Sequence, residues 1–250
     1  MQRYFVSNEQ FFNNQQIAIV GDDYHHIVRV MRMREGEEIV CCNENGQAAL
    51  CKITKITNDE VIANIIEWVE EQTELPINVY IAQGLPKGDK LELVIQKGTE
   101  LGAFSFIPFL AARSVVKWDA KKGDRKIERW NKIAKEAAEQ SQRTRIPTIS
   151  QPMSMNELIE FSSSIDYKII AYEEEAKKGE RANLTSVLNA IKPGQSLLAV
   201  FGPEGGFSEK EAAILLENGF ISCGLGPRIL RTETAPLYLL AAVSYQLELM

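Results

Sequence analysis

The sequence has 250 residues, 45% apolar and 25% charged, a composition that excludes a disordered or fibrous chain. The longest apolar run, residues 235–243, is far shorter than the roughly 20 residues that cross a bilayer, and the first residues do not resemble a secretion signal. We therefore expect a cytoplasmic protein with no membrane segment. The net charge of −6 argues against a protein that coats nucleic acid without selectivity.

The first 72 residues predict a small antiparallel β-barrel. This region begins with residues 3–6, and apolar spacing predicts a helix over 24–33. Short apolar segments separated by turns that contain Asn, Asp or Gly predict strands at 39–42, 48–53 and 61–66. The acidic stretch 67–74 is typical of a linker.

From residue 77 onward strands and helices alternate, which predicts an α/β domain with a mostly parallel sheet. Strands are expected at 77–83, 104–110, 167–172, 197–201 and 221–225, and helices at 89–101, 127–142, 155–161, 184–190, 209–218 and 234–249. Gly102 is placed to end the first of these helices in the left-handed conformation. The chain is thus predicted to divide into domains over residues 1–72 and 73–250.

Cysteine and histidine usage predicts no metal site. The four cysteines form no Cys-x-x-Cys pair, so we expect buried free thiols at Cys41, Cys42, Cys51 and Cys223. The two histidines, His25 and His26, are adjacent and cannot complete a zinc site with a cysteine cluster.

Charge is unevenly distributed along the chain. Residues 1–72 hold six basic and twelve acidic residues, whereas residues 113–145 hold eleven basic and five acidic ones. Such a basic strip is typical of selective contact with a polyanion, although a solvated helix face has the same composition. The candidate contacts to the phosphates of such a polyanion are Arg3, Arg29, Arg32, Arg113, Lys121, Lys122, Arg125 and Arg129.

A glycine-rich turn follows the strand predicted at 197–201. Residues 202–206 read Gly-Pro-Glu-Gly-Gly, and backbone without side chains can approach a ligand closely. Ser208 and Glu211 have the spacing of a capping box and fix the start of the next helix. A tight strand–helix connection without a ligand would use the same residues. The spacing matches neither a dinucleotide fingerprint nor a P-loop, so neither NAD nor ATP is favoured.

A second unusual loop follows the next strand. Residues 225–235 read LGPRILRTETA and lie at the carboxyl end of the predicted sheet, where open α/β sheets bind ligands. Arg228 and Arg231 alone could be ordinary surface residues. Two such loops at successive strand ends favour a shared pocket.

Together these motifs resemble the ribosomal RNA small subunit methyltransferase E family of the SPOUT superfamily. The resemblance is carried by 202–206 and 225–235 and extends to 25–32, 97–102, 113–114, 139–143 and Pro147. It implies a SPOUT trefoil-knot α/β domain that binds S-adenosylmethionine, preceded by a PUA-like β-barrel. Threaded chains are rare, so the knot is implied by the resemblance alone.

The resemblance also implies the reaction, transfer of the cofactor's methyl group to N3 of one uridine in small-subunit ribosomal RNA. The substrate would be this RNA or the 30S subunit, and the enzyme a homodimer. Glu233 could accept the N3 proton, and Arg228 or Arg231 could stabilise negative charge on the base. Glu233 could equally fix the loop by pairing with an arginine.

The cofactor set implied by the resemblance lies on three loops: Ala171, Tyr172, Phe201, Gly202, Pro203, Glu204, Gly205, Gly206, Leu225, Gly226, Ile229, Leu230 and Thr232. Two alternatives stay open. One is a non-catalytic RNA-binding factor for ribosome assembly, which S-adenosylmethionine binding would exclude. The other is a SPOUT methyltransferase that acts on transfer RNA.

Overall fold

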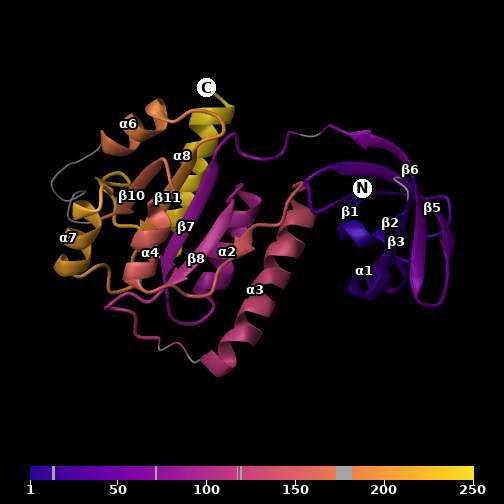
Figure 1. The fold of residues 1–250 in the computed structure, drawn as a ribbon, viewed down its shortest axis with the longest axis horizontal. Coiled ribbons are helices and arrows are strands. Elements are labelled where there is room, and N and C mark those ends of the chain that lie inside the picture. Colours follow the sequence, from indigo (N-terminus) through magenta and orange to yellow (C-terminus); the bar gives the residue numbers. More distant parts are fainter. Residues whose placement is uncertain (13–14, 71, 117, 119, 173–181) are drawn as a thin grey trace. The chain divides into compact units, whose positions relative to one another are not determined.

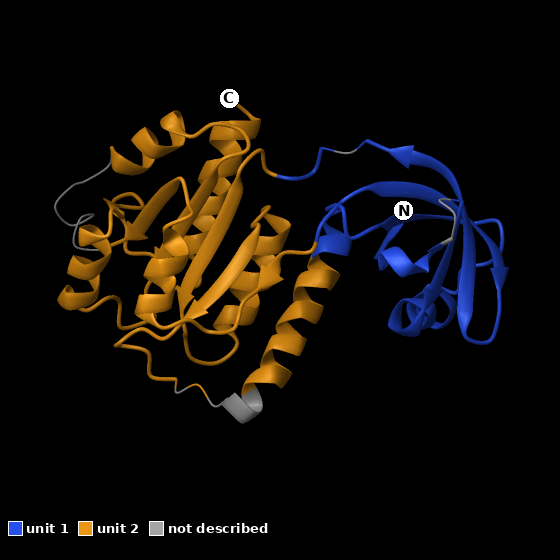
Figure 2. Ribbon diagram, in the orientation of Figure 1, with its two compact units in different colours: residues 1–74, 138–145 blue, residues 75–137, 146–250 orange. Residues whose placement is uncertain are grey.

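The structure, a computed structural model, describes residues 1–12, 15–70, 72–116, 118, 120–172 and 182–250. Contacts group them into unit 1, residues 1–74 with 138–145, and unit 2, residues 75–137 with 146–250 (Figure 2). The domain division predicted from the sequence, at residues 72 and 73, stays a prediction.

Unit 1 is built on a curled six-stranded sheet with the strand order β1-β4-β5-β6-β3-β2 (Figure 1). Its strands are β1 (Gln2–Phe5), β2 (Phe11–Phe12), β3 (Gln16–Val20), β4 (Glu38–Cys42), β5 (Ala48–Ile56) and β6 (Glu60–Val69). The neighbours pair antiparallel except β1, which pairs parallel with β4. The predicted antiparallel barrel is therefore corrected to a mixed sheet that forms a half-barrel.

Short helices accompany this sheet. A 3-10 turn, η1 (Asn8–Gln10), precedes β2, and α1 (Gly21–His25) continues into a π-helical turn, η2 (His26–Val30). The helix predicted over 24–33 thus begins and ends three residues earlier. The core of unit 1 includes Cys41 and Cys51, and all four cysteines of the chain are buried, as predicted.

Residues 138–145 complete unit 1 through a buried arginine. Arg143 is 2% exposed, and its guanidinium donates to both carboxylate oxygens of Glu74. The Thr144 N–H donates to Glu74 Oε1 at 3.0 Å, and Arg3 Nη1 donates to the Arg143 carbonyl oxygen at 3.0 Å. Three segments far apart in the sequence are thereby tied together.

Unit 2 contains a parallel six-stranded sheet with the order β12-β10-β11-β7-β8-β9 (Figure 1). Its strands are β7 (Asn78–Gly84), β8 (Ser105–Phe109), β9 (Thr148–Ile149), β10 (Tyr167–Ala171), β11 (Ser196–Phe201) and β12 (Ile221–Cys223). The α/β class with a parallel sheet is confirmed, and only the short β9 was not predicted.

Helices cover both faces of this sheet: α2 (Lys90–Glu100), α3 (Ala120–Gln140), α4 (Met155–Ser162), α6 (Asn183–Ala190), α7 (Glu209–Glu217) and α8 (Ala235–Glu248). Alternation along β11 sends Leu197 and Ala199 into the core shared with α2, α6 and α8, and Leu198 into the core shared with α4 and α7. Gly102 has φ +90°, the left-handed conformation predicted for the end of α2. Among the described residues, no helix has the length and apolar character needed to cross a membrane.

Candidate functional site

A cavity of about 610 Å³ opens at the carboxyl ends of β10 and β11 in unit 2. It lies at the carboxyl end of the sheet, where the two loops were predicted to bind a ligand, and its volume is within the roughly 300–1,000 Å³ typical of small-molecule sites. Eleven of the thirteen predicted cofactor residues line it: Ala171, Tyr172, Phe201, Gly202, Pro203, Glu204, Gly205, Gly206, Ile229, Leu230 and Thr232. The two loops singled out in the sequence therefore do share one pocket.

The two other predicted cofactor residues do not line the cavity. Leu225 is 9% exposed and packs in the larger core of unit 2. Gly226 has φ +83°, and it turns the chain out of β12. Both residues shape the path of the loop that carries Ile229 and Thr232.

The turn 202–206 folds tightly against the end of β7. A Cβ atom on Gly84 would lie 2.6 Å from Pro203 Cδ, and one on Gly202 would lie 3.0 Å from Gly206 Cα. A side chain at Gly84 would push the turn away from the sheet, and one at Gly202 would open the turn itself. Because the turn is packed this closely, its main chain forms part of the cavity wall.

The capping box after the turn is confirmed. Ser208 Oγ accepts from the Glu211 N–H at 3.2 Å, and Glu211 Oε2 accepts from the Ser208 N–H at 2.8 Å. Glu211 Oε1 also accepts from the Ala112 N–H at 2.6 Å. The start of α7, and with it the end of the glycine turn, is held from two sides.

Thr232 joins the second loop to two strand ends. Its Oγ1 donates to the Gly202 carbonyl oxygen at 2.7 Å and accepts from Gln83 Nε2 at 2.8 Å. Gln83 is 1% exposed at the end of β7. The segment after β12 therefore lies between the ends of β7 and β11, with Thr232 locked in place.

A charged cluster lies at the wall of the cavity. Lys90 Nζ lies 2.7 Å from Glu204 Oε1 and 3.8 Å from Glu233 Oε2. Burial raises the pKa of the Glu204 carboxyl, but hydrogen bonds from Lys90 Nζ and the Lys87 N–H outweigh this, so the net shift of its pKa is downward. Glu233 Oε2 is buried and accepts no hydrogen bond from the described residues. The cluster thus presents one carboxylate oxygen with spare accepting capacity.

Sequence reasoning missed Lys90, and it did not assign Phe207, Glu209 or Ala235 to this cavity, although all four line it. The signal for Lys90 was its position in the first turn after β7, since strand ends in a parallel sheet face one ligand site. Among the described residues, no group of His, Cys, Asp or Glu side chains is arranged to bind a metal ion.

The predicted arginines differ in their relation to the cavity. Arg231 lines it with Glu233, whereas Arg228 is exposed and does not line it. Arg113, predicted to contact RNA, also lines the cavity, and its Nη1 donates to the Gly205 carbonyl oxygen at 3.1 Å. Ile229 contributes an apolar side chain that is 71% exposed. These residues surround the glycine turn with both charge and apolar surface.

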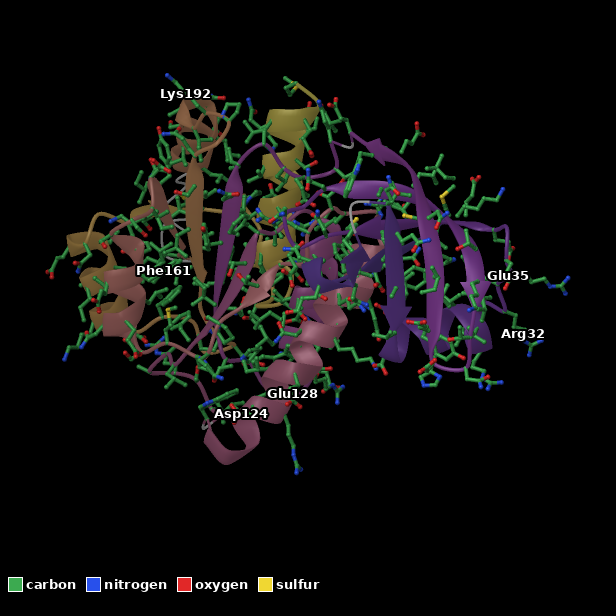
Figure 3. All side chains as sticks on the ribbon, turned by 45° about the vertical axis from the view of Figure 1, so that its right-hand side comes forward. Arg32, Glu35, Asp124, Glu128, Phe161 and Lys192 are labelled. Carbon is green, nitrogen blue, oxygen red and sulfur yellow. The ribbon has the colours of Figure 1, made fainter. Side chains whose placement is uncertain are left out.

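Arg3 is a correction among the RNA candidates of unit 1. It is 3% exposed and bonded to the Arg143 carbonyl oxygen, so its role is structural and it cannot contact a phosphate. Arg29 and Arg32 are exposed near the end of η2, and the Arg32 side chain extends away from the sheet (Figure 3). These two arginines stay candidates.

On α3, Arg125 and Arg129 are exposed, as phosphate contacts must be. Arg129 Nη2 donates to Glu92 Oε2 at 2.6 Å, so phosphate contact would have to compete with this ion pair. Asp124 and Glu128 lie on the same helix turns (Figure 3). The predicted contacts Lys121 and Lys122 lie outside the residues whose side chains the structure describes.

Known protein families match residues in both units. An RNA methyltransferase domain family matches residues 73–244, and an RNA methyltransferase PUA domain family matches residues 19–66. The ribosomal RNA small subunit methyltransferase E of Bacillus subtilis (strain 168) is 53% identical over 100% of this chain and 98% of its own length.

Two solved structures are similar over nearly the whole chain. The ribosomal RNA small subunit methyltransferase E of Neisseria gonorrhoeae, bound to S-adenosyl methionine, has a TM-score of 0.85 at 28% identity and covers 98% of this chain and 97% of its own. A methyltransferase from Legionella pneumophila, in complex with the same cofactor, has a TM-score of 0.82 at 28% identity and covers 97% of this chain and 96% of its own. The predicted combination of a PUA-like domain and a SPOUT domain is confirmed. The chain belongs to the ribosomal RNA small subunit methyltransferase E family of RNA methyltransferases.

Proposed function

We propose that this protein transfers the methyl group of S-adenosylmethionine to N3 of a uridine in small-subunit ribosomal RNA. The observation that carries the proposal is the cavity at the strand ends, whose wall contains eleven residues expected to bind this cofactor. Membership of the family supplies the substrate class.

The residues present fit the cofactor. The main chain of 202–206 and of Ala171 and Tyr172 offers hydrogen-bonding groups, while Leu230 and the exposed Ile229 offer apolar surface that an adenosyl group would cover. When bound, the cofactor supplies an electrophilic methyl group on a sulfonium. The protein's task is then to align the uridine N3 with that methyl group.

Glu233 and Arg231 are the two side chains of the cavity wall that we assign to the uracil ring of the substrate. N3 of uridine is protonated at neutral pH and lies on the pairing edge, so the base must be unpaired and its proton removed. Glu233 Oε2, which lacks a hydrogen-bond partner among the described residues, accepts that proton. Arg231, on the same loop, stabilises the negative charge that develops on the uracil oxygens. The corresponding role of Arg228 stays a prediction.

RNA phosphates contact exposed arginines outside the cavity, namely Arg29, Arg32 and Arg125, with Arg113 at the cavity edge. The substrate is small-subunit RNA or the 30S subunit, and the protein works in the cytoplasm as a homodimer. On α8, Leu239, Leu240 and Val243 are buried in unit 2, whereas Tyr238, Ala241 and Tyr245 are exposed. The exposed residues are the ones offered to a second copy.

Mass spectrometry of small-subunit ribosomal RNA tests the proposal directly. RNA from cells lacking the protein should lose one N3-methyluridine, and the purified protein with labelled cofactor should restore it. Loss of a methyl group from transfer RNA instead would favour the other SPOUT target. Calorimetry that detects no cofactor binding would leave only an assembly factor.

Replacing Glu233 with Gln tests its role as base. Glu233→Gln should retain cofactor affinity while turnover falls and its pH dependence flattens, because an amide cannot accept the proton. Glu209→Gln, a change to another acidic residue of the cavity wall, is the matched control and should leave the pH profile intact. Unchanged turnover of Glu233→Gln at every pH would remove Glu233 as base.

A further inference from the structure

Unit 1 contains a recess of about 400 Å³ that the proposed chemistry does not use. Its volume is within the range of small-ligand sites. The residues that line it come from η1, β2, β6 and the turn between β4 and β5: Asn8, Phe11, Asn43, Asn45, Gln47 and Trp68. The recess therefore combines aromatic and amide side chains, and no residue of this lining carries a charge.

The aromatic part is a stacked pair. The rings of Phe11 and Trp68 are separated by 5.9 Å between centroids and lie within 14° of parallel. Trp68 is nevertheless 42% exposed, so this contact leaves much of the indole uncovered. Flat π-systems that remain open in this way are the platforms on which proteins stack unpaired bases.

The amide part is held rigid by Asn43. This residue is 8% exposed, and its Oδ1 accepts from the N–H groups of Asn45 and Gln47, both at 3.0 Å. Its Nδ2 donates to Gln47 Oε1 at 2.9 Å, which orients the Gln47 amide so that its NH₂ group is available to a ligand. The Asn45 side chain also lines the recess. Amides offer donors and acceptors together, as the edge of a base requires.

A loop that follows α3 lies close to this turn. A Cβ atom on Gly46 would lie 3.8 Å from the Thr144 carbonyl oxygen, so the loop that carries the exposed Arg145 passes beside the turn. The uncharged lining of the recess suits a neutral planar group.

We propose that this recess binds one unstacked nucleobase of the substrate RNA. The base stacks on Trp68, and the amides of Asn45 and Gln47 contact its edge. The inference rests on the proposed function for its RNA partner, and it gives unit 1 a base-recognition role separate from methyl transfer. The uncharged lining and the stacked rings favour RNA over an acidic or basic protein segment.

The test measures binding of the full chain to the single-stranded hexaribonucleotides A6, C6 and U6 by fluorescence anisotropy. Trp68→Ala should weaken binding of the preferred oligonucleotide about 5-fold to 150-fold, the range for loss of one base–aromatic stack. Trp68→Phe should retain most of the affinity. Ile66→Ala removes another exposed apolar side chain of β6, 49% exposed, and should leave binding unchanged.

A second variant tests the amides. Asn45→Ala with Gln47→Ala should reduce the differences in affinity among A6, C6 and U6, because stacking alone is tolerant of sequence. Cofactor affinity, measured by calorimetry, should stay at the wild-type value in all variants, and circular dichroism checks that each one is folded.

The proposal is overturned if folded Trp68→Ala binds the hexanucleotides as wild type does, or if the wild-type chain binds none of them at millimolar concentration. If Trp68→Ala binds the 30S subunit more weakly but binds naked RNA as wild type does, the occupant of the recess is a ribosomal protein, and the proposal is overturned as well. Failure of the proposed function is distinguishable, since wild-type protein would then transfer no methyl group to ribosomal RNA whatever the hexanucleotides show.

Discussion

The cavity of unit 2 and the recess of unit 1 are built in different ways. The cavity wall includes the main chain of a turn packed within van der Waals distance of a strand end, together with charged side chains. The recess is lined by uncharged side chains on and between strands. A site made of main chain depends on the path of the fold, whereas a site made of side chains can lose one group and keep its shape. Substitutions should therefore separate cofactor binding from RNA binding.

The largest effect is expected from Arg143→Ala in unit 1. Removing the guanidinium leaves the Glu74 carboxylate without its buried partner, which should lower the free energy of unfolding by about 3 kcal/mol. Urea denaturation measures this, with exposed Arg29→Ala in the same unit as the control, expected to stay within about 0.5 kcal/mol of wild type. The cavity residues all belong to unit 2. Loss of cofactor affinity in a folded Arg143→Ala variant would therefore contradict the independence of the two sites.

Gly84→Ala should act next most strongly, and on unit 2. Its methyl group would lie 2.6 Å from Pro203 Cδ, so the turn must shift, at a cost of about 1–3 kcal/mol in folding free energy. We expect cofactor affinity in calorimetry to fall at least about tenfold. Hexanucleotide binding should be unchanged. Wild-type cofactor affinity in this variant would show that the path of the turn is unimportant.

Thr232→Val should have an intermediate effect. The substitution keeps the shape but removes the hydroxyl that joins Gly202 to Gln83, at a cost of about 1–2 kcal/mol. Cofactor affinity should fall about 5-fold to 30-fold. Thr234→Val, two residues further on, is the control, because the Thr234 side chain is exposed and makes no cap hydrogen bond to α8. Equal affinities of the two variants would contradict the bridging role.

The smallest effect is expected from the Lys90–Glu204 pair, and it depends on pH. Because the pKa of Glu204 is lowered in the folded protein, the pair supports the turn above the ordinary carboxyl pKa and is lost as the pH falls through the lowered value. The pKa of Lys90 is raised by its hydrogen bond to Glu204, so the pair persists until the pH rises above that raised value. Glu204→Gln should weaken cofactor binding by at most about fivefold at neutral pH. Calorimetry across pH should show the difference from wild type vanish in acid.

Local patterns in the sequence predicted much of unit 2. The Ser208 and Glu211 spacing fixed the start of α7, and the alternation of strands and helices fixed the sheet class and the edge at which the cavity lies. Helix α3 begins at Ala120, seven residues before its predicted start, because Gly123 and the surrounding charges hide the helical period. Most of the cavity residues were predicted because they follow strands directly.

Unit 1 was harder to predict because its decisive contacts are distant in the sequence. Residues 13–16 are all polar and show no strand pattern, so the pairing of β2 with β3 was not predicted. The alternation of apolar residues also does not indicate that β1 pairs parallel with β4. Arg3 was expected at the surface because charged residues usually lie there, yet its partner Arg143 is 140 residues away. Lys90 was missed for a related reason, since Glu204 and Glu233 meet it only through the topology of the sheet.

The discontinuity of unit 1 has a consequence for protein engineering. A chimera that exchanges residues 1–74 between two relatives would take Glu74 and Arg3 from one parent and Arg143 from the other. Hybrids should be stable only where the parents agree at these positions or where 138–145 is exchanged as well. The grafting unit for transplanting RNA preference is thus two separate stretches of chain.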